Sequence, residues 1–456
     1  MQEKVKLQFE LTKEYLNGLR EAIQSGNAPY IKESLEGINP VDLTELIYEL
    51  NVDESKFIID QLAPEIQAEV ISELDEDVIA DVLKVFSSAQ IASIVSRLES
   101  DDAADIIMEL PVKTREEIIA EIDNKEKASN IIELLRYEEN CAGGLMAKEI
   151  IKANDNWSVF QCIEEIRKQA EIVHKIYSVY VVNDKGILVG RVPLKKILLS
   201  SDNTPVTEIY DEDLISVMTY DSKEEAASVM RKYDLESLPV INVQGKLLGR
   251  ITIDDIVDVI SEQIEEERQL MSGISEDVEE DDSIWMLSRA RLPWLVIGLV
   301  GGILGAKVIG VFEEDLIELT AIAFFIPLIM ATGGNVGIQS SALVVQSLAN
   351  PPAFSQSLTN KLMKTLLVAL INGILLSLFV SGLVWLIDHD MKLSFVVSVA
   401  LFTVVLLASI LGTLIPLILD KMNINPALAS GPFITTFIDL IGLAIYFTVA
   451  HFMYNF

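Results

Sequence analysis

The hydrophobic and polar positions divide the chain into two regions with different patterns. From about residue 293 onward, apolar residues gather in five long blocks, and a helix needs roughly 20 such residues to cross a bilayer. The blocks lie at about 293–312, 318–349, 362–387, 393–419 and 427–453. Before them, short amphipathic segments alternate with polar turns. The pattern predicts an all-α membrane region of five helices, at 291–456, behind a water-soluble region.

The second block departs from a simple span. It is longer than one crossing requires, and Pro327 and the sequence TGGNVG at 332–337 interrupt it. Proline removes a backbone hydrogen-bond donor from a helix, and glycine lowers helix propensity. We therefore expect a broken or tilted helix in this block.

A repeat of 24 residues occupies the first part of the soluble region. Four segments align at that spacing: ELNVDESKFII (49–59), ELDEDVIADVL (73–83), RLESDDAADII (97–107) and EIDNKEKASNII (121–132). Each follows another amphipathic segment, so each repeat predicts a helical hairpin that buries its apolar face on its neighbours. Residues 1–139 are thus expected to form an all-α superhelix. Acidic residues open each second helix, and we expect most of them to serve as favourable N-terminal charges and caps.

A second repeat has a period of 59 residues. YVVNDKGILVGRV at 180–192 and PVINVQGKLLGRI at 239–251 each contain a β-branched run, a glycine turn and a second short strand. A helical pattern precedes and follows each copy, which predicts an α/β arrangement. This region resembles a tandem pair of CBS domains, at 140–261.

The CBS resemblance also implies a candidate nucleotide site. Many CBS domains hold a nucleotide through a Thr or Ser and an Asp after the second strand. Thr252 and Asp255 of GRITIDD match that pattern in the second copy, whereas GRVPLKK in the first copy lacks both. ATP is therefore a candidate ligand of one half of the pair.

Residues 262–290 connect the CBS pair to the first apolar block and are strongly acidic. Their first half can continue as a helix, and an acidic run at 276–282 precedes a Trp-containing approach to the bilayer. Blocks of like charge usually stay in water, which favours a solvated linker. The alternative is a connecting helix that reports cation occupancy to the membrane region.

The net charge of −34 lies almost wholly in the soluble region. Residues 1–290 hold 61 of the 69 acidic side chains but 29 of the 35 Lys and Arg, a net of −32. Such a surface repels nucleic acid and offers hard oxygen ligands to Mg²⁺ or Ca²⁺. The two cysteines, Cys141 and Cys162, lie in unrelated contexts and are expected to be reduced thiols.

The basic residues of the short loops predict the orientation of the spans. Arg289 and Arg291 precede the first block, Lys361 and Lys364 follow the second, and Lys421 follows the fourth. The N-terminal segment has no apolar signal region. We therefore expect a multi-pass protein of the cell membrane, with its N-terminus in the cytoplasm and its C-terminus outside.

The fifth block contains GPFITTFIDLIG at 431–442 and, within it, the carboxylate of Asp439. A charged side chain in hydrocarbon is expensive, so Asp439 should face protein or water. Gly431, Thr435 and Thr436 precede it at helical spacing, so small and polar residues share its side of the helix. Asp439 either forms a hydrogen bond to a neighbouring helix or receives a cation.

Oxygen-bearing residues of the second block favour the cation. Thr332, Asn335, Gln339 and Ser340 surround three glycines, with no cluster of soft ligands beside them. Oxygen ligands without soft ones select hard cations, Mg²⁺ foremost. If the chain forms a homodimer about the pore axis, two copies of Asp439 balance the charge of one divalent ion.

Taken together, the order of the regions and several motifs resemble the MgtE family of magnesium channels. The motifs are ATGGNVGIQS and PALASGPFITTFIDLIG in the membrane region, and LESDDAADIIMEL and AGGLM before it. The resemblance implies a homodimeric channel in which Asp439 binds a largely hydrated Mg²⁺ and Gly431, Thr435 and Asn335 line the pore. It also implies that cytosolic Mg²⁺ holds the pore closed by bridging acidic faces. The matching positions are Asp102, Asp254, Asp258, Glu262, Glu265 and Glu266.

One position departs from the family pattern. Many relatives have Asp-Pro before the fifth span, where this chain has Asn425-Pro426. A cation contact on the cytosolic side of that span is therefore expected to be weaker or to be carried by Asp420.

These features predict a passive, Mg²⁺-selective and Mg²⁺-gated channel in the lipid bilayer. An enzyme is not expected, because the soluble region holds no pairing of nucleophile and base, and no P-loop or aspartyl-phosphate motif couples transport to ATP. Two alternatives stay open. One is a secondary divalent-cation transporter driven by H⁺ or Na⁺, and the other is a membrane-anchored sensor whose CBS pair binds a nucleotide.

Overall fold

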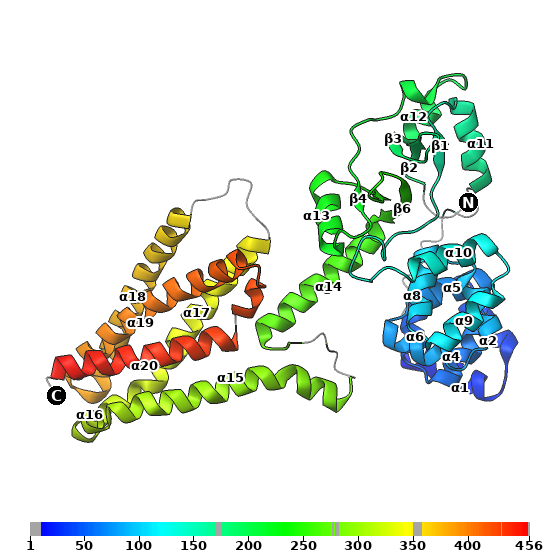
Figure 1. Cartoon of the computed structure of the whole chain (residues 1–456). Coiled ribbons are helices and arrows are strands. Elements are labelled where there is room, and N and C mark those ends of the chain that lie inside the picture. Colours follow the sequence, from blue (N-terminus) through cyan, green and yellow to red (C-terminus); the bar gives the residue numbers. More distant parts are fainter. Residues whose placement is uncertain are drawn as a thin grey trace, which may run out of the picture. The chain divides into compact units, whose positions relative to one another are not determined.

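The computed structural model describes residues 11–169, 173, 176–275, 278, 282–349, 358–429 and 431–454 of the 456-residue chain. The chain divides into two compact units, Met1–Ile260 and Ser261–Phe456, whose elements Figure 1 labels. Most of the acidic run 276–282 lies outside the described residues. The first unit combines helices with two small sheets, and the second is all-α.

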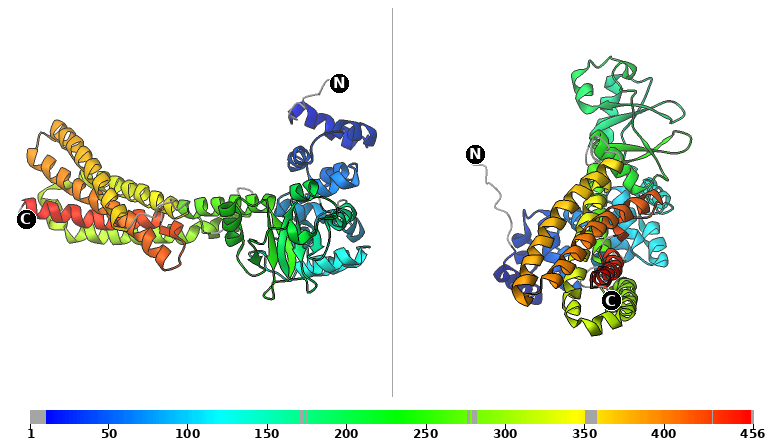
Figure 2. Two further views of the ribbon diagram at one scale, coloured as in Figure 1. Left: turned by 90° about the horizontal axis from the view of Figure 1, so that it is seen from above. Right: turned by 90° about the vertical axis from the view of Figure 1, so that its left-hand side faces the viewer.

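Within the described residues, ten short helices form the N-terminal part of the first unit. They are α1 (Lys13–Gln24), α2 (Ala28–Leu35), α3 (Pro40–Tyr48), α4 (Val52–Ile59), α5 (Pro64–Ser72), α6 (Glu76–Leu83), α7 (Ser88–Val95), α8 (Ser100–Met108), α9 (Val112–Glu121) and α10 (Lys125–Leu134). The starts of α4, α6 and α8 are 24 residues apart, as the repeat predicts. Helices two apart in the chain pack together, as α3 with α5, α5 with α7, and α4 with α6. The stack of hairpins, also visible in Figure 2, confirms the all-α superhelix.

The caps of these helices follow the expectation for the acidic residues only in part. Asn51 and Ser87 each close a capping box, at the starts of α4 and α7. Asp75 and Glu99 occupy the N-cap positions of α6 and α8, yet neither side chain makes a cap hydrogen bond in the described structure. Capping therefore does not account for the carboxylates that open α8.

Two three-stranded sheets with the same topology follow. The elements are β1 (Lys152–Asn154), α11 (Val159–Gln169), β2 (Ser178–Val182), β3 (Leu188–Pro193), α12 (Leu194–Leu199), η1 (Val206–Glu208), β4 (Val217–Met218), α13 (Lys223–Tyr233), β5 (Ser237–Ile241) and β6 (Leu247–Thr252). In each sheet the first strand runs parallel to the central strand, which pairs antiparallel with the third. The starts of β2 and β5 are 59 residues apart, as are those of β3 and β6. This repeat confirms the α/β CBS pair.

The last strand of the pair leads directly into α14 (Ile253–Ser272). Ile256 and Val259 of this helix belong to the core of the first unit. Leu270, near its end, belongs to a small apolar cluster of the second unit with Val345 and Ala427. The segment after the CBS strands therefore continues past residue 262 as a single helix of 20 residues.

The second unit consists mainly of long apolar helices. They and their short connections are α15 (Ile284–Val311), α16 (Glu313–Glu318), η2 (Thr320–Phe325), α17 (Ile326–Ala349), α18 (Leu358–Asp388), α19 (Met391–Lys421), η3 (Pro426–Ala429) and α20 (Pro432–Tyr454). Five stretches of the described residues are long and apolar enough to cross a membrane, and they coincide with the five predicted blocks. The all-α five-span region is thus confirmed.

The second span is not broken where TGGNVG predicted a break. Helix α17 continues through 332–337, and Pro327 lies in its first turn after η2. A proline there costs no helical hydrogen bond, because the first N–H groups of a helix have no partner within it. The change from η2 to α17 is the interruption that the long block contains.

The glycines of α17 bring helix backbones together. A Cβ on Gly412 of α19 would lie 2.5 Å from the carbonyl oxygen of Gly337, and a Cβ on Gly333 would lie 2.9 Å from Cγ1 of Val404. Small residues at such crossings are the usual means of close packing between membrane helices. The glycines of α17 therefore shape its packing surface and do not break the helix.

Candidate metal centres

Asp439 lies on the side of α20 that packs along α17. A Cβ on Gly334 of α17 would lie 3.0 Å from Cγ2 of Thr435 and 3.6 Å from Oδ1 of Asp439. This Oδ1 atom is buried and has no hydrogen-bond partner among the described residues. Leaving a buried carboxylate oxygen unsatisfied is costly. The site therefore holds an acceptor that is suited to a cation.

Thr435 is held one turn before Asp439 by the residue that precedes α20. Gly431 has a positive φ of 61°, and its carbonyl oxygen accepts hydrogen bonds from the N–H of Thr435 at 3.1 Å and from its hydroxyl at 2.8 Å. Gly431, Thr435 and Asp439 are each half-buried and form one stripe along the helix. Asn335 of α17, in contrast, is exposed in the single chain.

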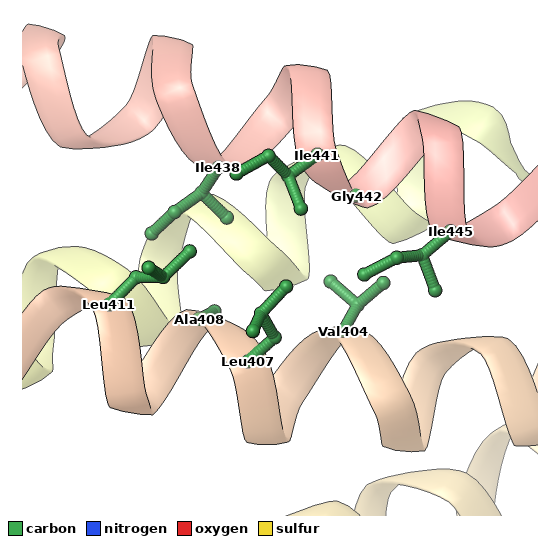
Figure 3. A pocket seen from close by; sticks show the side chains of 8 residues that line it. All are labelled: Val404, Leu407, Ala408, Leu411, Ile438, Ile441, Gly442 and Ile445. Atoms are coloured by element: carbon green, nitrogen blue, oxygen red, sulfur yellow. The ribbon is translucent and has the colours of Figure 1, made fainter.

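The residue next to Asp439 points elsewhere. Ile438 faces an apolar pocket between α19 and α20 (Figure 3). Successive residues of a helix project about 100° apart, so Asp439 does not enter this pocket. The lining is apolar throughout: Val404, Leu407, Ala408, Leu411, Ile438, Ile441, Gly442 and Ile445. It offers no side-chain oxygen to a cation, which leaves the α17-facing side of α20 as the candidate site.

A second group of carboxylates gathers in the first unit, around the start of α8. One carboxylate oxygen from each of Glu99, Asp101 and Glu149 lies within 4.8 Å of the others. Asp101 is 7% exposed, and its Oδ1 atom has no hydrogen-bond partner in the part of the chain that the structure describes. We call these three residues, with Asp102 and Asp255, the acidic cluster.

The pKa values of three aspartates in the acidic cluster are raised, because these side chains are buried close to other carboxylates. Burial first, and then the charges of Asp255 and Glu99, raise the pKa of Asp102 to about 7. Burial raises the pKa of Asp255 to about 6, although hydrogen bonds from Thr252 oppose the shift. Burial and the neighbouring Asp102 also raise the pKa of Asp101 well above its usual value. Ionised together, these groups destabilise the arrangement, and bound protons or divalent cations would relieve it.

A buried lysine partly offsets this charge. The side chain of Lys127 on α10 is 9% exposed, and its ammonium group lies 3.1 Å from Oε1 of Glu149. Oε2 of Glu149 accepts hydrogen bonds from the N–H of Ser100 at 3.0 Å and from its hydroxyl at 2.7 Å. Burial alone would raise the pKa of Glu149, but Lys127 and Ser100 together keep it below the usual range. The network ties α8 and α10 to the segment before β1.

Of the predicted regulatory residues, Asp102 lies on α8 and the other five lie on α14. Asp102 lies close enough to Asp254 for that charge to raise its pKa. Glu265 forms an ion pair at 2.6 Å with Arg268 of the same helix. Asp254, Asp258, Glu262 and Glu266 are among the exposed residues of α14. The structure thus brings Asp102 and the first turn of α14 together, and it leaves the later glutamates on the helix surface.

The candidate nucleotide residues contact one another. The N–H and the hydroxyl of Thr252 both donate to Oδ2 of Asp255, each at 2.9 Å. An acidic side chain at the third helical position that accepts from the N-cap backbone is one half of a capping box. The pair therefore has a structural role at the start of α14 besides any contact with a ligand.

Sequence reasoning missed several members of the acidic cluster. Glu99 and Asp101 lie beside the predicted Asp102 in LESDD, which was a usable signal. Glu149 is 49 residues from Ser100 in the chain, and Arg250, which pairs with Glu99 at 3.1 Å, is 151 residues from it. No local pattern connects such distant residues.

Comparison with known proteins gives three matching family profiles in sequence order. They are the MgtE intracellular N domain at 38–140, the CBS domain at 142–202 and 206–262, and the MgtE divalent cation transporter domain at 326–449. Together they match most of the chain.

Individual relatives extend this result. The magnesium transporter MgtE of Enterococcus faecalis is 35% identical over 325 residues, which are 71% of this chain and 71% of the relative. The magnesium transporter MgtE of Thermus thermophilus is 34% identical over 70% of this chain and 71% of its own length. A crystal structure of the cytosolic domain of the Mg²⁺ channel MgtE in complex with ATP is 31% identical, with a TM-score of 0.51, over 54% of this chain and 99% of that domain.

Proposed function

This chain belongs to the MgtE family of magnesium transporters, which are not enzymes, and from that premise we propose that it is a Mg²⁺-selective channel closed by cytosolic Mg²⁺. Transport is passive in this proposal, and Asp439 is the residue that receives the ion. The proposal rests on one observation above the others: the Oδ1 atom of Asp439, beside Gly334, is buried and has no hydrogen-bond partner within the part of the chain that the structure describes.

Selection of Mg²⁺ follows from the chemistry around Asp439. Mg²⁺ keeps several of its waters and is usually held by one or two carboxylates. In a homodimer, two copies of Asp439 supply the two negative charges that balance one ion. The carbonyl of Gly431, the hydroxyl of Thr435 and the amide of Asn335 line the path and accept hydrogen bonds from the water shell.

Closure by cytosolic Mg²⁺ follows from the acidic cluster and α14. The ligands we propose for regulatory ions are Asp102, Asp254, Asp258, Glu262, Glu265 and Glu266. The raised pKa of Asp102 supports this role, because a cation that neutralises crowded carboxylates stabilises the arrangement that brings them together. Bound ions bias the position of α14, and α14 biases the pore.

The orientation and the nucleotide belong to the same proposal. Basic residues in alternate short loops support a cytoplasmic N-terminus and an outer C-terminus in the cell membrane. ATP is a second regulatory ligand, and Thr252 and Asp255 are the residues that would contact it. The ATP complex of the related cytosolic domain supports this assignment. Since Asp255 already accepts two hydrogen bonds through Oδ2, a nucleotide would use its other oxygen.

The test is Mg²⁺ flux into liposomes that contain the purified full chain, with Mg²⁺ varied on the cytosolic side. Wild-type flux should fall as that Mg²⁺ rises, and Asp439→Ala should abolish flux. Asp388→Ala is the matched control, because it removes a carboxylate from the end of α18 and should leave flux in place. Flux that persists in Asp439→Ala would contradict the proposal.

Two other outcomes would favour the alternatives. Flux that follows a pH or Na⁺ gradient at fixed voltage would indicate a secondary transporter. Nucleotide binding with no Mg²⁺ flux under any condition would indicate a membrane-anchored sensor.

A further inference from the structure

Two glycines lie where the end of α14 approaches the start of α20. Gly273 follows α14 with a φ of 83°, and Gly431 precedes α20 with a φ of 61°. A Cβ on Gly431 would lie 2.3 Å from the carbonyl oxygen of Met271, and a Cβ on Gly273 would lie 2.7 Å from Cγ of Pro432. Both distances are below any ordinary contact of a Cβ atom, so each glycine makes room for the other element. We call this contact the glycine joint.

Other contacts fix the end of α14 at the joint. Leu270 and Met271 pack with Val345 of α17 and with Ala427. The N–H of Ser275 donates to the carbonyl oxygen of Ala290 in α15 at 3.0 Å. The end of α14 is therefore held by α15, α17 and the segment that leads into α20, so that a shift of the helix end must move at least one of them.

A short chain of contacts runs from the joint to the candidate ion site. Gly431 lies against the backbone of Met271. The carbonyl oxygen of Gly431 accepts both hydrogen bonds from Thr435. Cγ2 of Thr435 packs on Gly334, and Gly334 also borders Oδ1 of Asp439. The path uses backbone atoms and one β-branched side chain, whose χ1 angle is restricted. A displacement at Met271 should therefore move Thr435 and the ion site, because few side chains along the path can absorb it by changing rotamer.

We propose that Gly273 and Gly431 are positioning residues that couple α14 to the ion site through this direct backbone contact. The proposal rests on the proposed function, and it adds the place where the regulatory signal enters the pore helix. A side chain at either position separates the two elements, so cytosolic Mg²⁺ still acts on the first unit but no longer controls the pore.

The competing explanation is that the two glycines serve only the turns in which they lie. A positive φ favours glycine for conformational reasons alone, because a Cβ atom makes that backbone conformation unfavourable. Gly186 provides the matched control, because its φ is 76° but no atom lies within 4 Å of its Cβ position. Gly186→Ala carries the strain without the obstruction.

The experiment measures the ratio of Mg²⁺ flux at low and at high cytosolic-side Mg²⁺ for the full chain in liposomes. In Gly273→Ala and Gly431→Ala this ratio should fall by about 10-fold, a typical size for the loss of coupling between two sites. Gly186→Ala should keep the wild-type ratio. Protection of α8 from proteolysis on Mg²⁺ addition should be the same in all variants, since the first unit is unchanged.

A compensating substitution makes the test specific to the contact. Pro432→Ala removes the Cγ and Cδ atoms that a Cβ on Gly273 would meet at 2.7 and 3.2 Å. The double variant Gly273→Ala/Pro432→Ala should therefore recover most of the wild-type ratio, although the strain at position 273 persists. Recovery supports the joint, and its absence assigns the effect to backbone strain and overturns the proposal.

The two proposals fail in different ways. If the wild-type flux does not depend on cytosolic-side Mg²⁺, the proposed function is wrong and the coupling role falls with it. If the wild type responds and both joint variants respond equally well, the joint alone is overturned. Joint variants that do not fold leave Pro432→Ala as the readout, because it loosens the same contact without strain. An unchanged ratio in that variant then counts against the joint.

Discussion

The acidic cluster of the first unit and Asp439 of the second both contain a buried carboxylate oxygen that has no hydrogen-bond partner among the described residues, at Asp101 and at Asp439. Their surroundings are opposite. The cluster crowds several carboxylates and places Lys127 and Arg250 among them, whereas Asp439 lies among glycines, a threonine and apolar side chains.

This difference separates two ways of attracting a divalent cation. In the cluster, binding relieves repulsion between groups that the fold forces together, so affinity depends on how the fold is arranged. At Asp439, binding relieves the desolvation of a single charge in each chain. A sensor gains from the first design because ion occupancy then alters conformation, and a conduction site gains from the second because little has to move.

The largest effect should follow from neutralising Asp439. Asp439→Asn keeps the shape of the side chain but removes its charge, and Mg²⁺ flux should fall by about 30-fold or more, since the loss of a buried charged partner costs roughly 2–5 kcal/mol. The matching change in the cluster, Asp102→Asn, should instead shift the cytosolic Mg²⁺ concentration that closes the pore. Liposome flux measures both, and equal loss of flux in the two variants would remove the distinction between the sites.

The next effect concerns Lys127, the buried lysine that pairs with Glu149 of the acidic cluster. Lys127→Met leaves the buried carboxylate of Glu149 without its ammonium partner, and the docking of α8 and α10 should weaken by about 3–5 kcal/mol. Hydrogen exchange of α8 amides reports the loss. Lys168→Met is the control, because Lys168 pairs with Glu165 at an exposed site and should cost less than about 1 kcal/mol. Equal effects would mean that the cluster gains nothing from Lys127.

A smaller effect should follow from pH. The raised pKa values of Asp255, about 6, and Asp102, about 7, mean that protonation stabilises the gathered cluster. This contribution is complete below the usual aspartate value of 3.8 and is lost as pH rises through about 6 to 7. Because protons and Mg²⁺ neutralise the same groups, added Mg²⁺ should increase hydrogen-exchange protection of α8 more at pH 8 than at pH 5. The reverse order would place the Mg²⁺ effect outside the cluster.

The smallest effect is expected at the surface of α14. Glu265→Gln breaks an exposed ion pair with Arg268, and such pairs contribute little to stability because water screens them. If Glu265 also binds a regulatory ion, the Mg²⁺ concentration for half closure should rise by a factor of a few, with stability nearly unchanged. Glu164→Gln, which breaks the exposed pair with Arg167 in α11, is the control and should leave that concentration unaltered.

Local pattern predicted the elements well in both units. The repeat of 24 residues gave the hairpins of the superhelix, the repeat of 59 gave the CBS strands, and apolar length gave the five spans. These features depend on the periodicity of the sequence, which can be read from residues that are close together in the chain. The interpretation of 332–337 as a helix break was wrong, because propensity describes an isolated helix, whereas α17 packs its glycines against α19 and α20.

The candidate sites were predictable only in part. Asp439 stood out because a charge in an apolar block is locally conspicuous, whereas Asp102 was indicated only by the family resemblance of the motif in which it lies. The partners of Asp102 were hidden, since Glu149 and Arg250 reach the start of α8 from distant parts of the chain.

The sequence by itself determined where the chain can cross a membrane, which segments repeat and where its negative charge lies, because each of these depends on residues that are near one another in the chain. Only the tertiary structure decided which carboxylates share a site, that Lys127 is buried among them, and that Gly273 lies against Pro432. Such contacts join residues far apart in sequence, and their free energies come from burial, charge crowding and close packing, which exist only once the chain has folded.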